Sequence, residues 1–215
     1  MLRVLLAVGV LVGGTVSANV GVGGFGRYQA VSDGDDGYGA GALVEYRADG
    51  LVSGAFFQLR ASYLTGFGDG GLDLDAIPLE VGLGMRRSVS DDVSLYAMIL
   101  LGYFFMDVDS KETSVSVIRV DGRPIDTGRR VSYDVDDAIG FAIAFGGEWS
   151  LSDHFGLFGE VRYQQIKPEV ERTVTGGAGT TRVGNITIIQ GPGGTSSKKF
   201  DLGGVGAAAG LRWVF

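Results

Sequence analysis

The sequence predicts an all-β fold, an eight-stranded, antiparallel, up-and-down transmembrane β-barrel. Three observations lead to this prediction. Segments of about ten residues alternate apolar with polar or small side chains, and the connections between them alternate between short and long. After Ala18, no run of 18 apolar residues could cross a bilayer as a helix. Since the chain has 38 glycines and no cysteine, we expect a large sheet or a closed barrel held together by its own backbone hydrogen bonds.

Residues 1–18 (MLRVLLAVGVLVGGTVSA) predict a cleaved export signal. Arg3 is followed by an apolar run from Val4 to Val12, and Val16-Ser17-Ala18 supplies the small residues that signal peptidase requires. The apolar run is far shorter than the roughly 20 residues of a membrane-spanning helix. A buried N-terminal helix is the alternative, but three glycines would each cost it about 1 kcal/mol. We therefore expect cleavage near Ala18 and a barrel domain of residues 19–215.

Eight segments of the mature chain have the alternation and length of membrane-crossing strands. A strand tilted by about 45° needs about 9–11 residues to cross the hydrocarbon core, and single-chain bacterial barrels have an even number of strands. The predicted strands are Val20 to Val31, Tyr38 to Ala48, Ser53 to Leu64, Ile77 to Ser88, Val93 to Met106, Ala138 to Ser150, Phe155 to Lys167 and Gly203 to Phe215.

The connections between these strands alternate in length. Short periplasmic turns opposite long extracellular loops are typical of barrels in the bacterial outer membrane, and this pattern places both termini in the periplasm. The short connections are Asp49 to Val52, Val89 to Asp92 and Leu151 to His154, and the longer ones are Ser32 to Gly37, Thr65 to Ala76, Asp107 to Asp137 and Pro168 to Leu202.

Alternate residues of each predicted strand separate an apolar face from a polar one. The apolar face, as assigned, carries no charge and can lie against lipid, where an arginine at the midplane would cost about 2–4 kcal/mol. Its aromatic residues gather near the strand ends, as in the interfacial girdles of membrane proteins. The predicted girdle consists of Tyr38, Tyr46, Tyr63, Tyr103, Trp149, Phe155, Tyr163 and Trp213.

The polar face combines glycine with arginine, glutamate and glutamine. The planar guanidinium of arginine can bind a carboxylate through two parallel hydrogen bonds, and an eight-stranded barrel is only wide enough inside for side chains. We therefore predict a salt-bridged plug in the lumen; a selectivity lining or a catalytic cluster is the alternative. The predicted lumen charge network comprises Arg27, Glu45, Arg47, Arg60, Glu80, Arg86, Glu148, Glu160, Arg162 and Arg212.

The last eleven residues, Val205 to Phe215 (VGAAAGLRWVF), alternate apolar residues and end on phenylalanine. With Leu211, Trp213 and Phe215, this ending resembles the insertion signal of bacterial outer-membrane barrels. Strand pattern, loop lengths and ending together resemble the family of the OmpA transmembrane domain, OmpX and the opacity proteins over the whole mature chain. The resemblance implies a place in the bacterial outer membrane, insertion by the barrel assembly machinery, and contact with outer-membrane lipid and lipopolysaccharide.

Several functions are disfavoured by the residues present. The net charge of −7, or −8 without Arg3, argues against a nucleic-acid partner. The one histidine, His154, falls in a short turn beside Ser150 and Ser152, an arrangement typical of turns, so we expect no enzyme activity. We also expect no cofactor and no metal. The aspartates of the long loops match no twelve-residue calcium loop, and we interpret them as a solvated acidic rim.

The two longest loops, 107–137 and 168–202, are where we expect specific function. Their β-like segments predict strands that continue past the membrane into a protruding sheet, whose edges could pair with an extracellular protein partner. A barrel of ten or twelve strands is the alternative. The segments are Ser114 to Val120 and Arg129 to Val135 around Asp121-Gly122-Arg123-Pro124, Arg172 to Thr175, and Val183 to Gln190, with Gly191 to Lys199 as a mobile basic tip.

The sequence thus predicts a monomeric, non-enzymatic outer-membrane protein with a structural or surface-interaction role. The alternative is a narrow porin-like channel for small solutes, for which the lumen charges would form the lining. A purely structural role in the envelope is compatible with the same residues.

Overall fold

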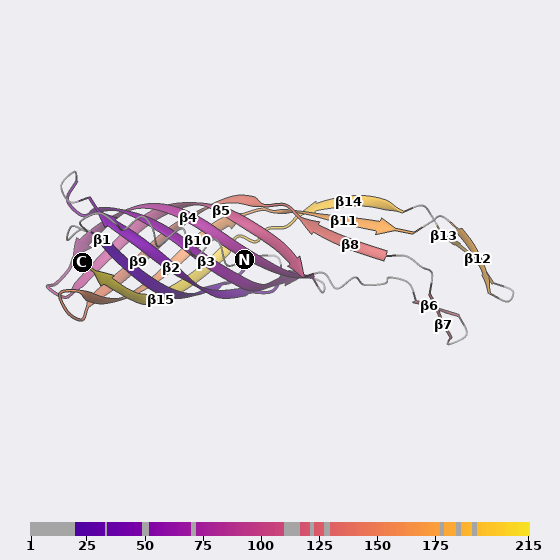
Figure 1. Cartoon of the computed structure of the whole chain (residues 1–215), viewed down its shortest axis with the longest axis horizontal. Helices are drawn as coiled ribbons and strands as arrows, with labels where there is room; N and C mark the ends of the chain where they lie inside the picture. The colour runs from indigo at the N-terminus through magenta and orange to yellow at the C-terminus, as the bar shows by residue number, and fades with distance from the viewer. Residues whose placement is uncertain are drawn as a thin grey trace.

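The computed structural model describes residues 20–32, 34–48, 52–69, 72–109, 117–120, 123–126, 130–176, 179–183, 186–190 and 193–215. Eight long strands form a closed antiparallel barrel in the order β1-β15-β10-β9-β5-β4-β3-β2, which confirms the predicted fold class (Figure 1). The alternative of ten or twelve barrel strands is wrong. The barrel strands are β1 (Val20–Gln29), β2 (Gly37–Arg47), β3 (Ala55–Asp69), β4 (Leu72–Ser88), β5 (Val93–Asp109), β9 (Ala138–Ser150), β10 (Phe155–Ile166) and β15 (Gly204–Val214).

Two further predictions concern the export signal and the absence of membrane-spanning helices. The predicted export signal and its cleavage site near Ala18 lie outside the described residues. In the described part of the chain, no helix is long and apolar enough to span a membrane.

The barrel is closed by its last strand. β15 pairs on one side with β1, from Gly21 opposite Val214 to Gln29 opposite Gly206, and on the other side with β10. Every barrel strand therefore has two neighbours, and the ring has no open edge.

Glycines on the inner wall make room for aromatic side chains in this narrow lumen. A Cβ at Gly84 would overlap the ring of Phe56, and one at Gly146 would overlap the ring of Tyr96. The high glycine content is thus partly explained by packing across the lumen, where small and large residues face each other.

The loop predicted from Thr65 to Ala76 is wrong, because β3 and β4 continue well past the predicted strand ends. Only residues 70–71 separate β3, which ends at Asp69, from β4, which begins at Leu72. The pairing shifts between Leu64 and Phe67, where Gly66 has a φ of +87°. Glycine adopts this left-handed conformation without steric cost, so the chain passes the bulge and resumes pairing.

Beyond the barrel, the two longest loops form a three-stranded projecting sheet in the order β14-β11-β8 (Figure 1). Two separate hairpins accompany it. The strands of the sheet are β8 (Arg130–Val135), β11 (Glu169–Thr175) and β14 (Gly194–Lys199), and the hairpins pair β6 (Val117–Val120) with β7 (Arg123–Asp126) and β12 (Gly179–Val183) with β13 (Ile186–Gln190).

Three details predicted for these loops are wrong. The segment Val183 to Gln190 is not one strand, because it is divided between β12 and β13. The segment Ser114 to Val120 does not face Arg129 to Val135; its described part, β6, pairs with β7 instead. Of the expected mobile tip Gly191 to Lys199, residues 194–199 form β14, which pairs with β11 along its length. Cross-strand contacts between the two loops, such as Val170 opposite Val135, decide this arrangement.

The largest apolar cluster lies where the projecting sheet meets the mouth of the barrel. It combines barrel residues such as Leu64 and Phe104 with Val135, Val170 and Phe200 from the base of the sheet. Each of these side chains is at most 9% exposed. The sheet therefore rests on the barrel through a buried apolar contact.

Candidate functional site

The ten charges of the predicted lumen network all lie on the inner face of the barrel. Alternation along each strand places them there, on strands β1, β2, β3, β4, β9, β10 and β15. Eight of the ten residues are buried. The other two, Arg47 and Arg86, lie near the short turns, where their side chains are 33% and 13% exposed.

At the turn end of the lumen, Glu45 is the centre of an ion-pair cluster. Its carboxylate receives two hydrogen bonds from Arg86, at 2.9 and 3.1 Å, and one from Arg212 at 2.6 Å. Arg212 also donates to Glu148, and Arg86 Nη2 lies 3.2 Å from Glu148 Oε2. Arg47 is more distant, with its Nε 3.7 Å from Glu45 Oε1. The cluster links β2, β4, β9 and β15 across the lumen.

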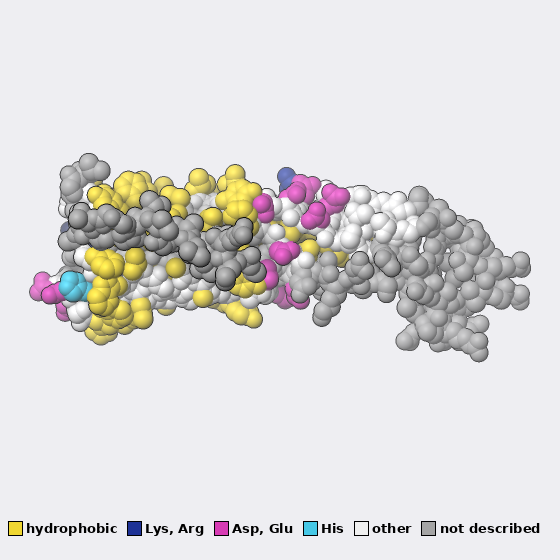
Figure 2. All heavy atoms as spheres, viewed as in Figure 1, with side chains coloured by type: hydrophobic (Ala, Val, Ile, Leu, Met, Phe, Trp, Pro, Cys, Tyr) yellow, Lys and Arg dark blue, Asp and Glu magenta, His cyan; other side chains and the backbone are white. Residues whose placement is uncertain are grey.

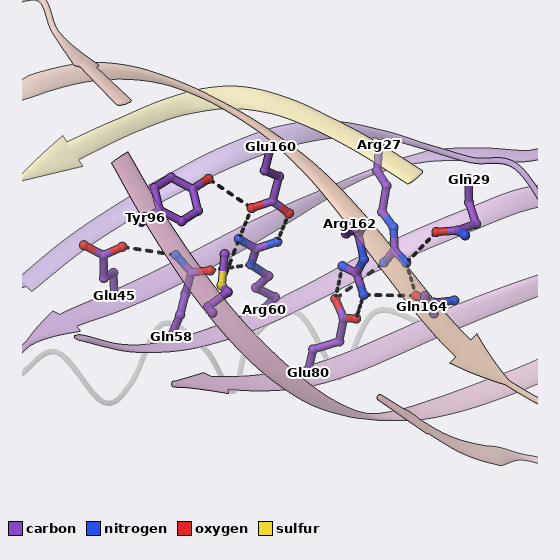
Figure 3. Close-up of polar contacts among 11 residues, drawn as sticks. Arg27, Gln29, Glu45, Gln58, Arg60, Glu80, Tyr96, Glu160, Arg162 and Gln164 are labelled. Carbon is purple, nitrogen blue, oxygen red and sulfur yellow. Dashed lines mark hydrogen bonds and ion pairs between the residues drawn. The ribbon is translucent and has the colours of Figure 1, made fainter. Parts of the chain in front are cut away.

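Midway along the lumen, Arg60 and Glu160 form a bidentate pair (Figure 3). The two Arg60 nitrogens donate to the two Glu160 oxygens over 2.5 and 2.7 Å, and the Tyr96 hydroxyl donates to Glu160 Oε2 over 3.0 Å. Gln58 joins this pair to the turn end, because it accepts from Arg60 and donates to Glu45. Tyr96 was missed from the sequence, although it lies on the inward-facing half of its strand.

Nearer the loops, Glu80 binds two arginines (Figure 3). Arg162 donates to both Glu80 oxygens, one of them over 3.1 Å, and Arg27 Nη1 lies 3.4 Å from Glu80 Oε2. Gln164 accepts from both arginines. Two positive charges thus share one carboxylate, with an amide oxygen as the second acceptor.

Apolar groups separate these polar layers. Phe25, Leu43, Phe158 and Ala208 form one buried cluster within the barrel. Phe56, Tyr96, Met98, Leu100, Ala142 and Ala144 form another. These side chains are buried inside the barrel, beside the ion pairs.

The end of the barrel at the short turns is hollowed. A cavity of about 860 Å³ lies there, and its lining includes Arg47, Phe56, Arg86, Tyr96 and Glu148. Tyr96 donates to the buried Glu160, so the cavity ends against the middle ion pair. Beyond that pair lie the ion pairs of Glu80 and the apolar cluster at the barrel mouth, whose side chains are buried.

Arginine exceeds glutamate in this network by six to four, a formal charge of +2. The donors are correspondingly in excess: in the described part of the chain, the Nε atoms of Arg27, Arg86, Arg162 and Arg212 bind no acceptor. Every glutamate has at least one arginine partner. Among the described residues, Arg27 and Arg162 pair only with Glu80, and Arg60 pairs only with Glu160, so removal of either carboxylate leaves buried positive charge without compensation. Such losses typically cost about 3–5 kcal/mol.

The outer wall is apolar in the region of the barrel (Figure 2). All eight predicted girdle residues lie on this wall; Phe155 is half-buried, and the other seven are 41–63% exposed. The expectation of no charge on this face is wrong at Arg87, which is exposed on the outward-facing side of β4. Arg87 lies one residue before the end of the strand, where the guanidinium can reach the membrane surface.

Tyrosines at the loop end of the wall bind aspartates, a feature that we did not predict. The Tyr63 hydroxyl donates to Asp75 over 2.5 Å and the Tyr103 hydroxyl donates to Asp137 over 3.0 Å. Tyr28 binds Asp36 in the same way. Figure 2 shows acidic side chains gathered where the apolar cover ends. Among the described residues, no group of three histidines or acids is arranged to hold a metal ion.

The short turn between β9 and β10 contacts the final strand, β15, through His154. His154 stacks on Trp213, with ring centroids 6.1 Å apart, and its Nδ1 lies 3.1 Å from the Val214 oxygen. Leu211, Trp213 and Phe215, the predicted insertion signal, are all exposed on the outer wall. The contacts of His154 are therefore packing contacts with the last strand.

These observations define an integral membrane β-barrel with a packed lumen. The sequence matches the model of the outer membrane protein beta-barrel domain over residues 5–190, and the chain belongs to this family. Its place is therefore the bacterial outer membrane. No curated protein matches the sequence significantly.

Solved structures with a similar fold include two outer-membrane proteins. The outer membrane protein OprG from Pseudomonas aeruginosa has a TM-score of 0.61 at 14% identity, covering 94% of this chain and 98% of that one. Neisserial surface protein A (NspA) has a TM-score of 0.54 at 13% identity, covering 94% and 100%. At such identities, the similarity shows a shared fold.

Proposed function

We propose that this protein is a monomeric, non-enzymatic surface-interaction protein, anchored by a sealed barrel, that binds an extracellular protein partner through loops 107–137 and 168–202. The observation that supports this most is the projecting sheet β14-β11-β8, in which all six residues of β14 are exposed. The ion pairs and apolar clusters in the lumen support it as well, because they leave the loop side as the accessible functional surface.

The surroundings of His154 support the absence of catalysis. The imidazole is stacked on Trp213 and bonded to the backbone of the final strand. A general base must reach the proton that it abstracts from a bound substrate. An imidazole engaged in this way fits a structural role.

The test is to replace residues 171–199 with a short glycine-serine linker and to measure surface binding. Cells of a laboratory Gram-negative strain that display the protein would be assayed on immobilised extracellular-matrix proteins and on cultured cells. We expect binding to fall to the level of cells without the protein. The control removes only the β12–β13 hairpin, residues 179–190, and should retain binding. Unchanged binding after the larger deletion would contradict the proposal.

A narrow channel is the second candidate, favoured by the cavity at the turn end and by the excess of lumen arginines. Planar-bilayer recordings separate the two. A sealed barrel gives no steady ohmic steps, whereas a channel gives steps whose size changes with Glu45→Gln or Arg60→Ala. Because the lumen network carries a formal +2, such steps would be anion-selective.

A further inference from the structure

The barrel closes where its first strand meets its last. β1 and β15 are neighbours in the ring, and we call this pair the closing seam. Every other pair of neighbouring barrel strands follows directly along the chain, so the turn or loop between the two strands limits how far they can slide. The register of the closing seam therefore depends on the contacts that β1 and β15 make with each other and with the strands around them.

The inner face of β15 offers few side chains that could fix this register. Arg212 is the only charged residue of the strand and has the longest side chain on its inner face. The inward residues of β15 are Gly204, Gly206, Ala208, Gly210, Arg212 and Val214. Strands rich in glycine specify their register weakly, because a shifted pairing meets little steric conflict.

The Arg212 side chain reaches past both neighbours of its own strand. Beyond β1, its Nη1 donates to Glu45 of β2 over 2.6 Å. Beyond β10, its Nη2 donates to Glu148 of β9. Glycine lies opposite Arg212 on each neighbouring strand, as Gly23 on β1 and Gly156 on β10. One guanidinium thus joins β15 to the strands two places away on either side.

A shift of the seam by two residues keeps each side chain on its own face of the sheet, since the faces repeat with that period. A shift of β15 toward the loops would bring Arg212 opposite Phe25, whose ring opposes it. A shift toward the turns would bring Arg212 opposite Gly21, about 7 Å from its present place, and the glycines and alanine that follow would meet no obstacle. That second shift is opposed mainly by the loss of the contacts of Arg212.

From these observations we infer that Arg212 sets the register in which the barrel closes. Its contacts with Glu45 and Glu148 form when β15 lies in the native alignment with β1 and are lost when the seam shifts. Selection of one alignment among several is an established use of buried polar groups. This role goes beyond the proposed surface interaction and is independent of it, because it concerns how the barrel is formed.

The other arginines of the turn-end cluster do not hold the seam. Arg86 of β4 binds Glu45 and Glu148, and Arg47 of β2 contacts Glu45, so these contacts involve neither β1 nor β15. Without Arg212, the cluster has two arginines for two glutamates. The charges in the lumen then still compensate each other, and a barrel without Arg212 can fold in a shifted register.

Disulfide cross-linking reads the register directly, because the sequence contains no cysteine. Gly26→Cys on the outer wall is combined with Ala209→Cys as the native pair, with Ala207→Cys as the turn-shifted pair, or with Leu211→Cys as the loop-shifted pair. A Cβ at Gly26 meets no atom within 4 Å, so the cysteine fits. Diagonal positions on neighbouring strands lie about 7–8 Å apart, beyond the usual reach of a disulfide.

Each barrel is refolded from urea into lipid vesicles and oxidised, and the cross-linked fraction is measured on a gel. In the parent, we expect the native pair to cross-link at least tenfold more than either shifted pair. Arg212→Met keeps much of the volume and removes the charge, and it should raise cross-linking of the turn-shifted pair at least tenfold. Arg212→Lys keeps a donor at this position and should stay within threefold of the parent.

Arg47→Met is the matched control, because it removes an arginine from the same cluster but away from the seam. It should keep the parental cross-linking pattern. Heat-modifiable gel mobility verifies that each variant is a folded barrel. A parental pattern in folded Arg212→Met, even with lowered stability, would overturn the inference. So would an equal shift in Arg47→Met, since the charge balance of the cluster would then set the register.

An exchange of charges covers the case in which Arg212→Met does not fold. Arg212→Glu combined with Glu148→Arg restores opposite charges between β15 and β9. We expect this double variant to fold and to cross-link through the native pair. Failure to recover the native pair would overturn the inference.

Discussion

The lumen and the base of the projecting sheet both contain ion pairs, but those in the lumen are buried and the one at the base of the sheet is exposed to water. In the lumen, the Arg162 and Glu80 side chains are 0% and 2% exposed, and Glu80 also contacts Arg27. Above the membrane, Lys167 and Asp201 form a single contact of 3.0 Å with side chains that are 50% and 35% exposed. Water compensates either member of the outer pair if its partner is lost. Inside the barrel, only another side chain can do so.

This difference teaches that the lumen and the projecting sheet respond differently to substitution of a charged residue. Buried charges depend on one another, so a substitution in the lumen affects several groups and destabilises the barrel. Exposed charges on the sheet interact weakly and can change without unfolding it. The exposed residues of the projecting sheet can therefore change while the barrel stays intact.

The largest effect is expected for Glu80→Ala, which leaves Arg27 and Arg162 without their shared carboxylate. We expect a loss of about 3–5 kcal/mol in the free energy of unfolding, measured by urea titration in lipid vesicles with tryptophan fluorescence. The control is Glu171→Ala, at an exposed position opposite Asp134, which should change stability by less than about 0.5 kcal/mol. Similar losses in both variants would show that burial does not distinguish the two regions.

An arginine moved from the lumen to the lipid face gives the next largest effect. Val81 is 59% exposed at the middle of the apolar wall, and Val81→Arg should cost about 2–4 kcal/mol in the same assay. The control is Val89→Arg, in the turn after β4, where Val89 is 65% exposed and water can solvate the charge. We expect little loss there. If both substitutions were equally tolerated, the wall around Val81 would not face hydrocarbon.

Much of the barrel could be predicted because alternation is a local property. Each strand's own sequence shows which residues face inward, and this was enough to identify both faces and all eight strands. Which arginine binds which glutamate could not be predicted. Glu45 and Arg212 meet across β1, 167 residues apart in sequence, and their contact depends on the tilt and stagger of the closed sheet.

The projecting sheet was harder to predict because its pairing is not local. β8 and β11 come from different loops, and their register is set by contacts such as Val174 opposite Val131. The short strands near Asp121-Gly122 and Asn185 could each pair with more than one other short segment of these loops. The sequence alone therefore allowed several pairings. The aspartates that bind rim tyrosines were recognised as an acidic rim, but their partners on neighbouring strands were missed.

The attachment of the sheet to the barrel gives a smaller effect, tested by Val170→Ala. Val170 is 3% exposed in the apolar cluster at the barrel mouth. Loss of two methyl groups at about 0.8 kcal/mol each predicts a local destabilisation of about 1–2 kcal/mol. Hydrogen exchange should accelerate in β11 and β14 and stay unchanged in β5. Thr173→Ala, at a half-buried position near the tip, is the control. Equal acceleration in both variants would show that the sheet is not held by this cluster.

The smallest effect concerns the exposed pair Lys167–Asp201 and depends on pH. The Lys167 ammonium and the Gly203 N–H hold the pKa of Asp201 below its usual value. A lowered pKa in the folded protein adds stability above about pH 4, the ordinary aspartate value, and this contribution disappears as the pH falls further and the carboxylate is protonated. The amide oxygen that Asp201→Asn introduces can still accept from the Gly203 N–H, so this substitution removes mainly the ion pair. We expect the variant to be less stable by under about 1 kcal/mol at pH 7 and equal to the parent at about pH 2 to 3, measured by urea titration. A difference that persists in acid would assign the effect to packing and remove the contrast with the lumen pairs, for which burial keeps the charges dependent on each other.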